Sequence, residues 1–506
     1  MTNAIDTVNS LVWSNALVYL LLGAGAFFTL STLFLQVRCL PEMVRQLRQG
    51  EKSESGVSSF QSLMMSLAGR VGVGNIAGVA TAIAFGGPGA VFWMWMVALL
   101  GSATSFIECT LGQIYKEKDK DTGEYRGGPA YYVEKAYRHT KAAPFFRVYA
   151  ILVAVVLVIS TSYFMPGVQA NGVATAVENA WDVPNWLTGI ILASLLAMII
   201  IGGVKRIATF ASLVVPCMAT VYILFAIVIL VVNYQQIPEV FGMIIRAAFD
   251  QEAAFSGMLG AAISWGVKRG LYSNEAGQGF GPQPAAAAEV SHPAKQGFVQ
   301  SCAVYIDTLF VCSATAFIII STDMFRVFAD ESEDGAVIYA GEISDNISVG
   351  PGFVQSGLDT VFGGFGSSFV AFAIVFFAFT TIMAYYYLAE TNATYLNRSI
   401  KNGAVRHGLI WGLRVLTLIA VIFGAVSSSG ASWSLGDIGA GLTAWFNIIA
   451  ILILQVPAHK CLWDYRRQKK AGLDPVFDPE ALGIKNADFW VERKREREAA
   501  AVQHDS

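Results

Sequence analysis

Long apolar segments alternate with short polar connections along almost the whole chain. About 18 or more consecutive apolar residues are typical of a helix that spans a membrane. The pattern therefore predicts an all-α membrane protein. We expect eleven transmembrane helices, at residues 14–37, 60–86, 89–115, 147–178, 186–203, 207–233, 255–287, 297–321, 366–391, 407–427 and 439–458.

Two of the predicted spans are interrupted by clusters of glycine. Residues 66–78 read S-L-A-G-R-V-G-V-G-N-I-A-G, and residues 270–282 read G-L-Y-S-N-E-A-G-Q-G-F-G-P. Because glycine costs about 1 kcal/mol relative to alanine inside a helix, these clusters indicate helices that open. Small residues also serve close helix packing, but so many glycines in one run favour an unwound segment. A pair of broken helices at matching places in two halves is typical of the binding site of a secondary transporter.

The order of the spans predicts how the chain is divided. When the first span is set aside, ten remain, and each group of five begins with a broken helix. An odd number of spans per half gives the halves opposite orientations, which is an inverted 5+5 repeat. We expect an extra N-terminal helix and loop (1–59), two five-helix repeats (60–233 and 234–458) and a C-terminal tail (459–506).

Composition and charge agree with a membrane protein, and the distribution of charge predicts its orientation in the membrane. Apolar residues make up 55% of the chain and charged residues only 14%, whereas about a quarter of a soluble domain is charged. The net charge of −3 gives no sign of nucleic-acid binding. Lys and Arg number 28 on one side of the predicted membrane and 2 on the other, which predicts an outside N-terminus and a cytoplasmic C-terminus. The tail carries the run E-R-K-R-E-R-E (492–498), which we expect to form a solvated helix.

The first glycine cluster offers groups for an anion and for a cation. A half-helix that starts near Gly74 points its amides, with Asn75 close by, toward the middle of the membrane, where they suit a carboxylate. The upstream half-helix ends with free carbonyls around Ala68 and Val71, which suit a small hard cation.

Two neighbouring hydroxyls in another predicted span could complete the cation site. Thr380 and Thr381 would add neutral oxygens to the carbonyls of the first cluster. Threonines in membrane helices often bond their own i−4 carbonyl instead, so the pair by itself is weak evidence for a site.

Other side chains within the predicted spans are candidates for the same site or for structural roles. Phe280 and Tyr385 would form its walls and leave room only for a small ligand, and Gln169 is a candidate for the polar head of that ligand. Lys268 and Arg269 lie near the second break, and a structural or gating salt bridge is at least as good a prediction for them as ligand contact.

A further charged residue, Arg70, lies inside the first break. We predict that it pairs with Glu108 or Glu275. The alternative is that its charge replaces a second cation. An ion pair is the safer prediction, because charged side chains within a membrane usually pair with one another.

Three stretches of the chain resemble one known transporter family. They are residues 69–95 (G-R-V-G-V-G-N-I-A-G-V-A-T-A-I-A-F-G-G-P-G-A-V-F-W-M-W), residues 269–277 (R-G-L-Y-S-N-E-A-G) and residues 377–382 (F-A-F-T-T-I). The chain resembles the alanine or glycine:cation symporters, also called sodium:alanine symporters. The resemblance implies a leucine-transporter (LeuT) type fold with one extra N-terminal helix. It also implies sodium-driven uptake of small neutral amino acids across a bacterial inner membrane.

The resemblance also assigns roles to residues of this chain. It implies a sodium site made of two backbone carbonyls and two hydroxyls, those of Ala68, Val71, Thr380 and Thr381. It implies a carboxylate site on backbone amides beside an asparagine, at Val73, Gly74 and Asn75. Gln169 matches the pocket glutamine of the family.

The chain departs from the family pattern in two places. Many members have threonine where Val73 stands, so this chain lacks a hydroxyl there but keeps the backbone amide. Many also have tryptophan where Tyr385 stands. These departures leave the size of the pocket open.

Other functions compete with that of a sodium symporter. A proton-coupled carrier, or a carrier for another neutral amino acid such as serine or glutamine, stays open because Glu108, Glu275, Asp307 and Glu390 lie in predicted spans. A channel would need a continuous pore, and broken helices argue against one. The sequence has no H-E-x-x-H or G-x-S-x-G motif and no paired catalytic carboxylates, so we expect no enzyme activity. We expect no cofactor beyond Na+ as the coupling ion.

Overall fold

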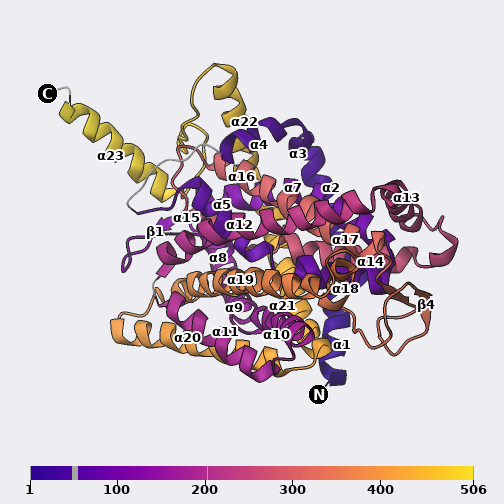
Figure 1. Ribbon diagram of the computed structural model, residues 1–506. Helices are drawn as coiled ribbons and strands as arrows, with labels where there is room; N and C mark the ends of the chain where they lie inside the picture. The colour runs from indigo at the N-terminus through magenta and orange to yellow at the C-terminus, as the bar shows by residue number, and fades with distance from the viewer. Residues whose placement is uncertain (1, 48–54, 202, 505–506) are drawn as a thin grey trace.

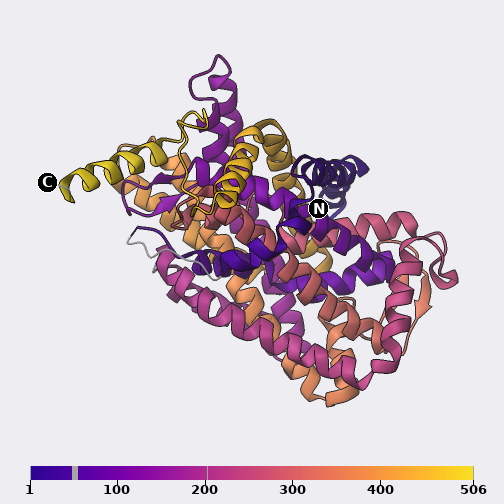
Figure 2. The same ribbon diagram turned by 90° about the horizontal axis from the view of Figure 1, so that it is seen from above.

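The computed structural model describes residues 2–47, 55–201 and 203–504, and most of them are helical. Long helices such as α19 (Phe365–Asn397) and α20 (Gly403–Val426) run across the view in Figure 1. The C-terminal helix α23 (Asp488–His504) lies at one end of these helices, and the hairpin that contains β4 (Val337–Ala340) lies at the other (Figures 1 and 2). Of the basic residues that oriented the chain, Arg48 and Lys52 lie outside the described residues.

The first half of the chain contains the first broken helix and the helices that surround it. Its elements are α1 (Thr2–Val12), α2 (Asn15–Ser31), α3 (Leu35–Arg38), α4 (Leu40–Leu47), α5 (Ser59–Arg70), the π-helical η1 (Gly74–Gly78), α6 (Val79–Gly86), α7 (Gly89–Ile114), β1 (Glu117–Lys118), β2 (Tyr125–Arg126), α8 (Pro129–Ala136), α9 (Ala143–Ile159), the π-helical η2 (Ser160–Phe164), α10 (Met165–Trp181), α11 (Asn185–Ile200) and α12 (Gly203–Val232). The strands β1 and β2 form a short antiparallel hairpin.

The second half contains the second broken helix and the C-terminal segment. Its elements are the 3-10 turn η3 (Tyr234–Gln236), α13 (Ile237–Ala248), the 3-10 turn η4 (Ala253–Phe255), α14 (Leu259–Asn274), α15 (Pro282–Ala287), α16 (Pro293–Tyr305), the π-helical η5 (Ile306–Cys312), α17 (Ser313–Ser321), β3 (Arg326–Phe328), β4, α18 (Pro351–Phe362), α19, α20, α21 (Ser429–Leu454), α22 (Val456–Lys470) and α23. The strands β3 and β4 are antiparallel, with an irregularity after Val327.

Fewer helices than the predicted eleven spans are long and apolar enough to cross a membrane unaided. Among the described residues there are 8 such helices, or 9 when the bent pair α5 and η1–α6 counts as one span. The predicted span 186–203 is the 16-residue helix α11, which at 1.5 Å per residue reaches about 24 Å, less than the roughly 30 Å of a hydrocarbon core. The predicted span 255–287 consists of two shorter helices, α14 and α15.

Both glycine clusters break their helices. The axis of α5 is bent by 54° from that of Gly74–Gly86, and Val71 between them has an extended backbone (φ −81°, ψ 91°). In the second cluster, Glu275 has a left-handed conformation (φ 57°), and Gly277 and Gly279 also have positive φ angles (91° and 79°). Glycine adopts this backbone region without a steric cost, which explains why the sequence places it between α14 and α15.

The helix α7 packs along α14 and α16 in the interior of the bundle. Its neighbours approach so closely that side chains are excluded at two glycines. A Cβ atom on Gly266 of α14 would lie 2.6 Å from the Ala90 carbonyl oxygen, and one on Gly112 of α7 would lie 2.6 Å from the Pro282 carbonyl oxygen. This packing places the buried polar side chains of α7 against the second break.

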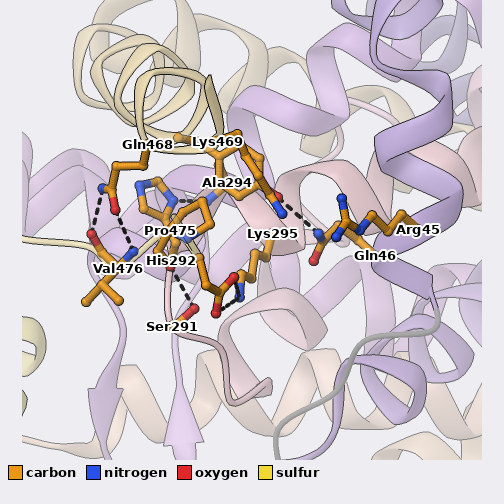
Figure 3. Close-up of polar contacts among 12 residues, drawn as sticks. Arg45, Gln46, Ser291, His292, Ala294, Lys295, Gln468, Lys469, Pro475 and Val476 are labelled. Carbon is orange, nitrogen blue, oxygen red and sulfur yellow. Dashed lines mark hydrogen bonds and ion pairs between the residues drawn. The ribbon is translucent and has the colours of Figure 1, made fainter. Parts of the chain in front are cut away.

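The C-terminal segment folds back onto the end of the bundle that carries β1. Figure 3 shows Ser291 Oγ donating a hydrogen bond to the Pro475 carbonyl (2.8 Å). Trp490, only 3% exposed, donates its ring N–H to the Gln113 carbonyl (2.9 Å). The predicted helix over E-R-K-R-E-R-E is confirmed in α23. Elsewhere in the tail, Trp490 and Phe477 join the buried core, which the sequence did not predict.

Candidate functional site

Side-chain oxygens accept hydrogen bonds from the backbone amides that the first break exposes. Gly72 N donates a hydrogen bond to Asn75 Oδ1 (2.8 Å), and Val73 N donates to Gln169 Oε1 (2.9 Å). Gln169 reaches this position from α10, so the break is bound to a neighbouring helix as well as to itself. The structure thus brings two of the predicted carboxylate-site residues, Val73 and Asn75, together with the predicted pocket glutamine.

The hydroxyl of Thr381 lies among carbonyl oxygens from two helices. Its Oγ1 atom is 2.8 Å from the Ala68 oxygen and 3.3 Å from the Val71 oxygen, both at the first break, and 2.9 Å from the Phe377 oxygen of its own helix. The Thr380 hydroxyl donates only to the Phe377 carbonyl (2.9 Å) among the described residues. Three of the four predicted sodium-site residues therefore meet directly, and Thr380 bonds its own helix.

Aromatic rings lie at both breaks. The rings of Phe280 and Tyr385 pack edge to face with centroids 5.9 Å apart. Tyr272, which the sequence interpretation did not single out, lies against Gly74, where an added Cβ would be 3.1 Å from its ring. All predicted site residues are buried, so the site is closed to solvent: Ala68, Val71, Val73, Gly74, Asn75, Gln169, Phe280, Thr380, Thr381 and Tyr385.

The second break is filled by a carboxylate from α7. Glu108 accepts hydrogen bonds from Gly277 N (3.1 Å), Gly279 N (3.1 Å) and Asn447 Nδ2 (2.8 Å). The amides that a helix break exposes thus have a partner within the protein. The sequence suggested Glu108 as a partner of Arg70 or as a proton carrier, and its contacts with the second break went unpredicted.

A second buried carboxylate, Asp307, lies where the two broken helices meet. It accepts a hydrogen bond from Asn75 Nδ2 (2.5 Å) in the first broken helix and from Ser273 Oγ (2.8 Å) in the second. The hydroxyl of Thr308 also donates to it (2.8 Å). Sequence reasoning named Asp307 only as a candidate proton carrier. Its position inside a predicted span was the available signal, because ionisable residues in membrane helices are functional candidates by default.

The charged residues beside the second break form an ion-pair cluster. Asp437 of α21 pairs with Arg269 (2.7 Å) and with Lys268 (2.9 Å), and the Arg269 guanidinium also stacks over the Trp433 ring (4.2 Å). The salt bridge predicted for these two cations is therefore present. Both cations belong to α14, which ends before the break.

The ion pair predicted for Arg70 is wrong. Its guanidinium donates hydrogen bonds to the Gln300 carbonyl (3.1 Å) and to Ser105 Oγ (3.4 Å). Within the described part of the chain, no carboxylate oxygen lies within 4.0 Å of it, so neither Glu108 nor Glu275 is a direct partner. A guanidinium has five donors and no acceptor; two neutral oxygens accept hydrogen bonds from Nη1 and Nη2 of Arg70, whereas its buried Nε has no hydrogen-bond partner among the described residues.

A polar cavity of about 910 Å³ lies apart from the two breaks, near β1, β2 and the adjoining ends of α19 and α20. Arg126 and Glu390 pair at 3.6 Å in its wall. Because Glu390 is paired with a buried arginine, it is a poorer candidate for a proton carrier than the sequence suggested.

Comparisons with known proteins support the resemblance found in the sequence. Residues 1–479 match the model of the sodium:alanine symporter family. A Bacillus subtilis protein named as a candidate sodium/proton-dependent alanine carrier is 53% identical, over 97% of this chain and 98% of its own length. The sodium/proton-dependent alanine carrier of Bacillus sp. (strain PS3) is 46% identical, over 88% of this chain and 97% of its own.

A third relative carries the name of a different substrate. This Bacillus subtilis protein, named as a candidate sodium/glutamine symporter, is 42% identical over 97% of this chain and 96% of its own length. The family match over nearly the whole chain and these identities confirm the resemblance. The chain belongs to the sodium:alanine symporter family of membrane transporters.

Proposed function

We propose that this chain is a sodium-coupled symporter that carries a small neutral amino acid, alanine and/or glycine, into the cell by alternating access. The observation that carries the proposal is the meeting of the Thr381 hydroxyl with the carbonyls of Ala68 and Val71. This cluster adjoins the unwound segment whose Val73 amide is bound by Gln169. Family membership and the names of the two alanine carriers support the same function.

The proposed sodium ion lies among the Ala68 and Val71 carbonyls and the Thr381 hydroxyl. These oxygens suit a small hard cation, and the carbonyls lie at the C-terminal end of α5, where the helix dipole carries about half a negative charge. Thr380 joins the site when its hydroxyl turns away from Phe377. Sodium would connect the broken helix to α19 and so order the break.

The proposed substrate carboxylate lies on the amides of Val73 and Gly74, at the N-terminus of the downstream half-helix. Gln169 accepts the Val73 hydrogen bond in the closed structure (2.9 Å), so the carboxylate would replace the Gln169 oxygen. This exchange keeps the Val73 donor paired in both states, which matters because an unpaired buried donor costs about 1–3 kcal/mol. The released Gln169 amide would then contact the polar end of the amino acid, which carries its charged groups. Asn75 would lie nearby.

The crowding around the break supports a small substrate. A Cβ on Gly72 would lie 2.6 Å from Thr381 Oγ1 and 2.7 Å from Gln169 Oε1. The Tyr272 ring limits the space further, because an added Cβ on Gly74 would lie 3.1 Å from it. Alanine and glycine demand the least displacement of these groups.

The proposed arrangement in the membrane keeps the predicted eleven spans and the LeuT-type 5+5 inverted repeat. The divisions are the N-terminal helix and loop (1–59), the two repeats (60–233 and 234–458) and the tail (459–506). The excess of Lys and Arg on one side supports an outside N-terminus and a cytoplasmic C-terminus in a bacterial inner membrane. In this orientation the tail and the 910 Å³ cavity lie on the cytoplasmic side.

Sodium coupling would supply the energy for accumulation. One charge that moves through 100 mV contributes about 2.3 kcal/mol, which corresponds to roughly fifty-fold accumulation. Coupling requires that sodium and the amino acid favour the same closed state, and each must then tighten the binding of the other.

The test is uptake by purified protein in liposomes, with labelled alanine, glycine, serine and glutamine. We expect accumulation of alanine or glycine only with an inward sodium gradient, and its loss when an ionophore collapses that gradient. Liposomes without protein are the control. Accumulation that does not require sodium and is driven by a pH gradient would refute sodium coupling and support a proton-coupled carrier.

A second candidate is sodium-coupled uptake of a larger neutral amino acid such as glutamine. The 42% identical relative named as a glutamine symporter favours it. So does Tyr385, which stands where many family members have the larger tryptophan. The same liposome assay separates the candidates, because glutamine would then be accumulated in preference to alanine.

A further inference from the structure

A groove of about 310 Å³ lies between the segment that follows the first long apolar helix and the segment that follows the last. The first segment consists of α3 and α4, the second is α22, and all three helices lie at the same end of the molecule in Figure 1. A hydrogen bond from Gln46 Nε2 to the Tyr465 hydroxyl (3.0 Å) holds α4 against α22. The floor of the groove is formed by the buried rings of Tyr465 and Phe298, whose centroids are 5.2 Å apart.

Basic side chains outnumber acidic ones in the lining of this groove. Arg38, Arg466 and Lys469 line it together with one acid, Glu42. The Glu42 carboxylate is shared between Lys469 at 3.9 Å and Arg45 at 4.0 Å. Both distances are long for an ion pair, so this single acid leaves the groove with a surplus of positive charge.

Two of the cations in the lining have no acidic partner. Within the described residues, no carboxylate oxygen lies within 4.0 Å of Arg38 or Arg466. Arg38 donates a hydrogen bond to the Leu33 carbonyl (3.1 Å), and the Arg466 guanidinium lies over the Trp463 ring (5.2 Å). Because each of these contacts uses only part of a guanidinium, both side chains keep donors for an anion.

The larger cavity near β1 differs from this groove in how its cations are paired. Lys135 pairs there with Glu117 (2.8 Å), and Arg406 pairs with Asp121 (2.8 Å). An anion that entered the larger cavity would compete with these carboxylates. The smaller groove therefore suits an anion better.

Exposed apolar side chains lie beside the groove. Phe34 and Val37 project from the start and the end of α3, and Leu40 and Val44 lie four residues apart, on one face of α4. A short helix with apolar and charged side chains on different faces is typical of a helix that lies in the membrane surface. The exposed Trp463 of α22 belongs to a residue type that is enriched at that depth. A ligand of the groove is therefore expected to have an apolar part as well as an anionic one.

We propose that this groove binds an anionic phospholipid. Its phosphate lies among Arg38, Arg466 and Lys469, and its acyl chains lie along the exposed apolar side chains of α3 and α4. Guanidinium groups bind phosphate through paired hydrogen bonds, and basic pockets at the membrane surface bind phospholipid head groups. A free phosphate ion would satisfy the cations but leave the apolar side chains without a partner.

The bound lipid would connect two distant parts of the chain. Arg38 belongs to the segment after the extra N-terminal helix, and Arg466 belongs to the segment after the last long apolar helix. In the proposed orientation both segments face the cytoplasmic leaflet, and the inference rests on the proposed function only for this placement. Because the lipid binds the folded protein, it should also raise the apparent melting temperature.

The experiment measures the lipid that the purified full-length protein retains in detergent, by native mass spectrometry. The protein is supplied with equal amounts of phosphatidylglycerol, which is anionic, and phosphatidylcholine, which is zwitterionic. We expect the wild type to retain one phosphatidylglycerol molecule with at least ten-fold preference. Equal retention of the two lipids would show binding through acyl chains alone and would overturn the proposal.

A variant without the three cations locates the site. Arg38→Gln with Arg466→Gln and Lys469→Gln should bind phosphatidylglycerol roughly 100-fold more weakly, because each cation near an anionic lipid contributes about five-fold in affinity. It should also lose the rise in melting temperature that this lipid gives the wild type. Wild-type retention of phosphatidylglycerol by this variant would overturn the proposal.

The matched control removes the same number of charges elsewhere. Lys141→Gln with Arg495→Gln and Arg497→Gln changes three exposed cations outside the groove and should keep the wild-type preference. If this control loses the preference as fully as the groove variant, net charge and not the groove selects the lipid, and the proposal fails.

A single substitution keeps the test decisive if the triple variant does not fold. Arg38→Gln changes one exposed side chain and should weaken phosphatidylglycerol binding about five-fold. An unchanged affinity would contradict the site.

Inorganic phosphate separates a lipid site from a site for a free anion. We expect millimolar phosphate to leave phosphatidylglycerol bound, since phosphate has no acyl chains. Displacement of the lipid by phosphate would assign the groove to a free anion and overturn the proposal. Because binding is measured without transport, failure of the proposed symport would leave this result unchanged.

Discussion

The Thr381 hydroxyl oxygen lies 2.8 Å from the Ala68 carbonyl oxygen, across the boundary between α19 and the first broken helix. The two residues are 313 positions apart in the chain. Their contact is a direct link between the end of α5 and a helix of the other half. Any ion that replaces this hydrogen bond with coordination will change how tightly the break is held to α19.

Thr381→Ala should raise the sodium concentration needed for half-maximal uptake by roughly 5- to 30-fold. Loss of one ligand oxygen to a cation is worth about 1–2 kcal/mol. Uptake is measured as a function of sodium at saturating alanine. Thr381→Ser keeps the hydroxyl and should stay close to the wild type, and an unchanged sodium dependence in Thr381→Ala would remove α19 from the cation site.

Gly72→Ala should reduce uptake at least ten-fold while the protein still reaches the membrane. The new methyl would lie 2.6 Å from Thr381 Oγ1 and 2.7 Å from Gln169 Oε1, and overpacking of this kind costs about 1–3 kcal/mol. The matched control is Gly78→Ala, because a Cβ there would lie 3.6 Å from Trp433, an ordinary contact. Equal uptake by the two variants would place Gly72 outside the transport site.

Asp437→Asn should lower the apparent melting temperature of the protein. The change leaves Arg269 and Lys268 without their carboxylate, and removal of one partner from a buried ion pair costs about 3–5 kcal/mol. Asp437 is 2% exposed, so solvent does little to offset this loss. The measurement is thermal unfolding in detergent, followed by loss of the monodisperse fraction.

The control for this variant is Asp345→Asn. Asp345 pairs with Arg326 at 3.1 Å, but its side chain is fully exposed (100%). Solvent screens this exposed carboxylate, and Arg326 keeps its hydrogen bonds to the carbonyls of Asp345 and Ile347 when the carboxylate is lost, so this variant should melt at the same temperature as the wild type. If Asp437→Asn and Asp345→Asn have the same melting temperature, the cluster at Asp437 does not stabilise the closed structure.

Features that depend on residues close together in the sequence could be predicted, whereas contacts between residues far apart in the sequence could not. The broken helices were predictable because glycine clusters are costly within an apolar span. The contact of Glu108 with Gly277, 169 positions away, left no periodic signal. The same is true of Asp307 and Asn75, which are 232 positions apart. The prediction for Arg70 failed because a sequence lists the carboxylates within reach but does not show the carbonyl oxygens that compete with them.

The number of membrane-spanning helices was also only partly predictable from the sequence. Hydropathy located every long apolar helix, but α11 has 16 residues and the second broken span is divided between α14 and α15. Helices this short lie below the length that hydropathy alone associates with a full crossing. Whether they cross depends on their packing with neighbours, and a sequence pattern does not contain that information.

Tyr385→Trp should change which amino acids the protein prefers. The Tyr385 ring packs edge to face against Phe280 with centroids 5.9 Å apart, and it is 1% exposed. A larger indole in this closed space removes volume beside the proposed substrate, so uptake of serine and glutamine should fall more than uptake of glycine. One extra methylene in a tight pocket changes discrimination by about 10- to 200-fold, which makes the effect measurable by competition with labelled alanine. Tyr19→Trp, at a tyrosine that is 71% exposed, should keep the wild-type ranking; if Tyr385→Trp keeps it as well, the ring lies outside the substrate pocket.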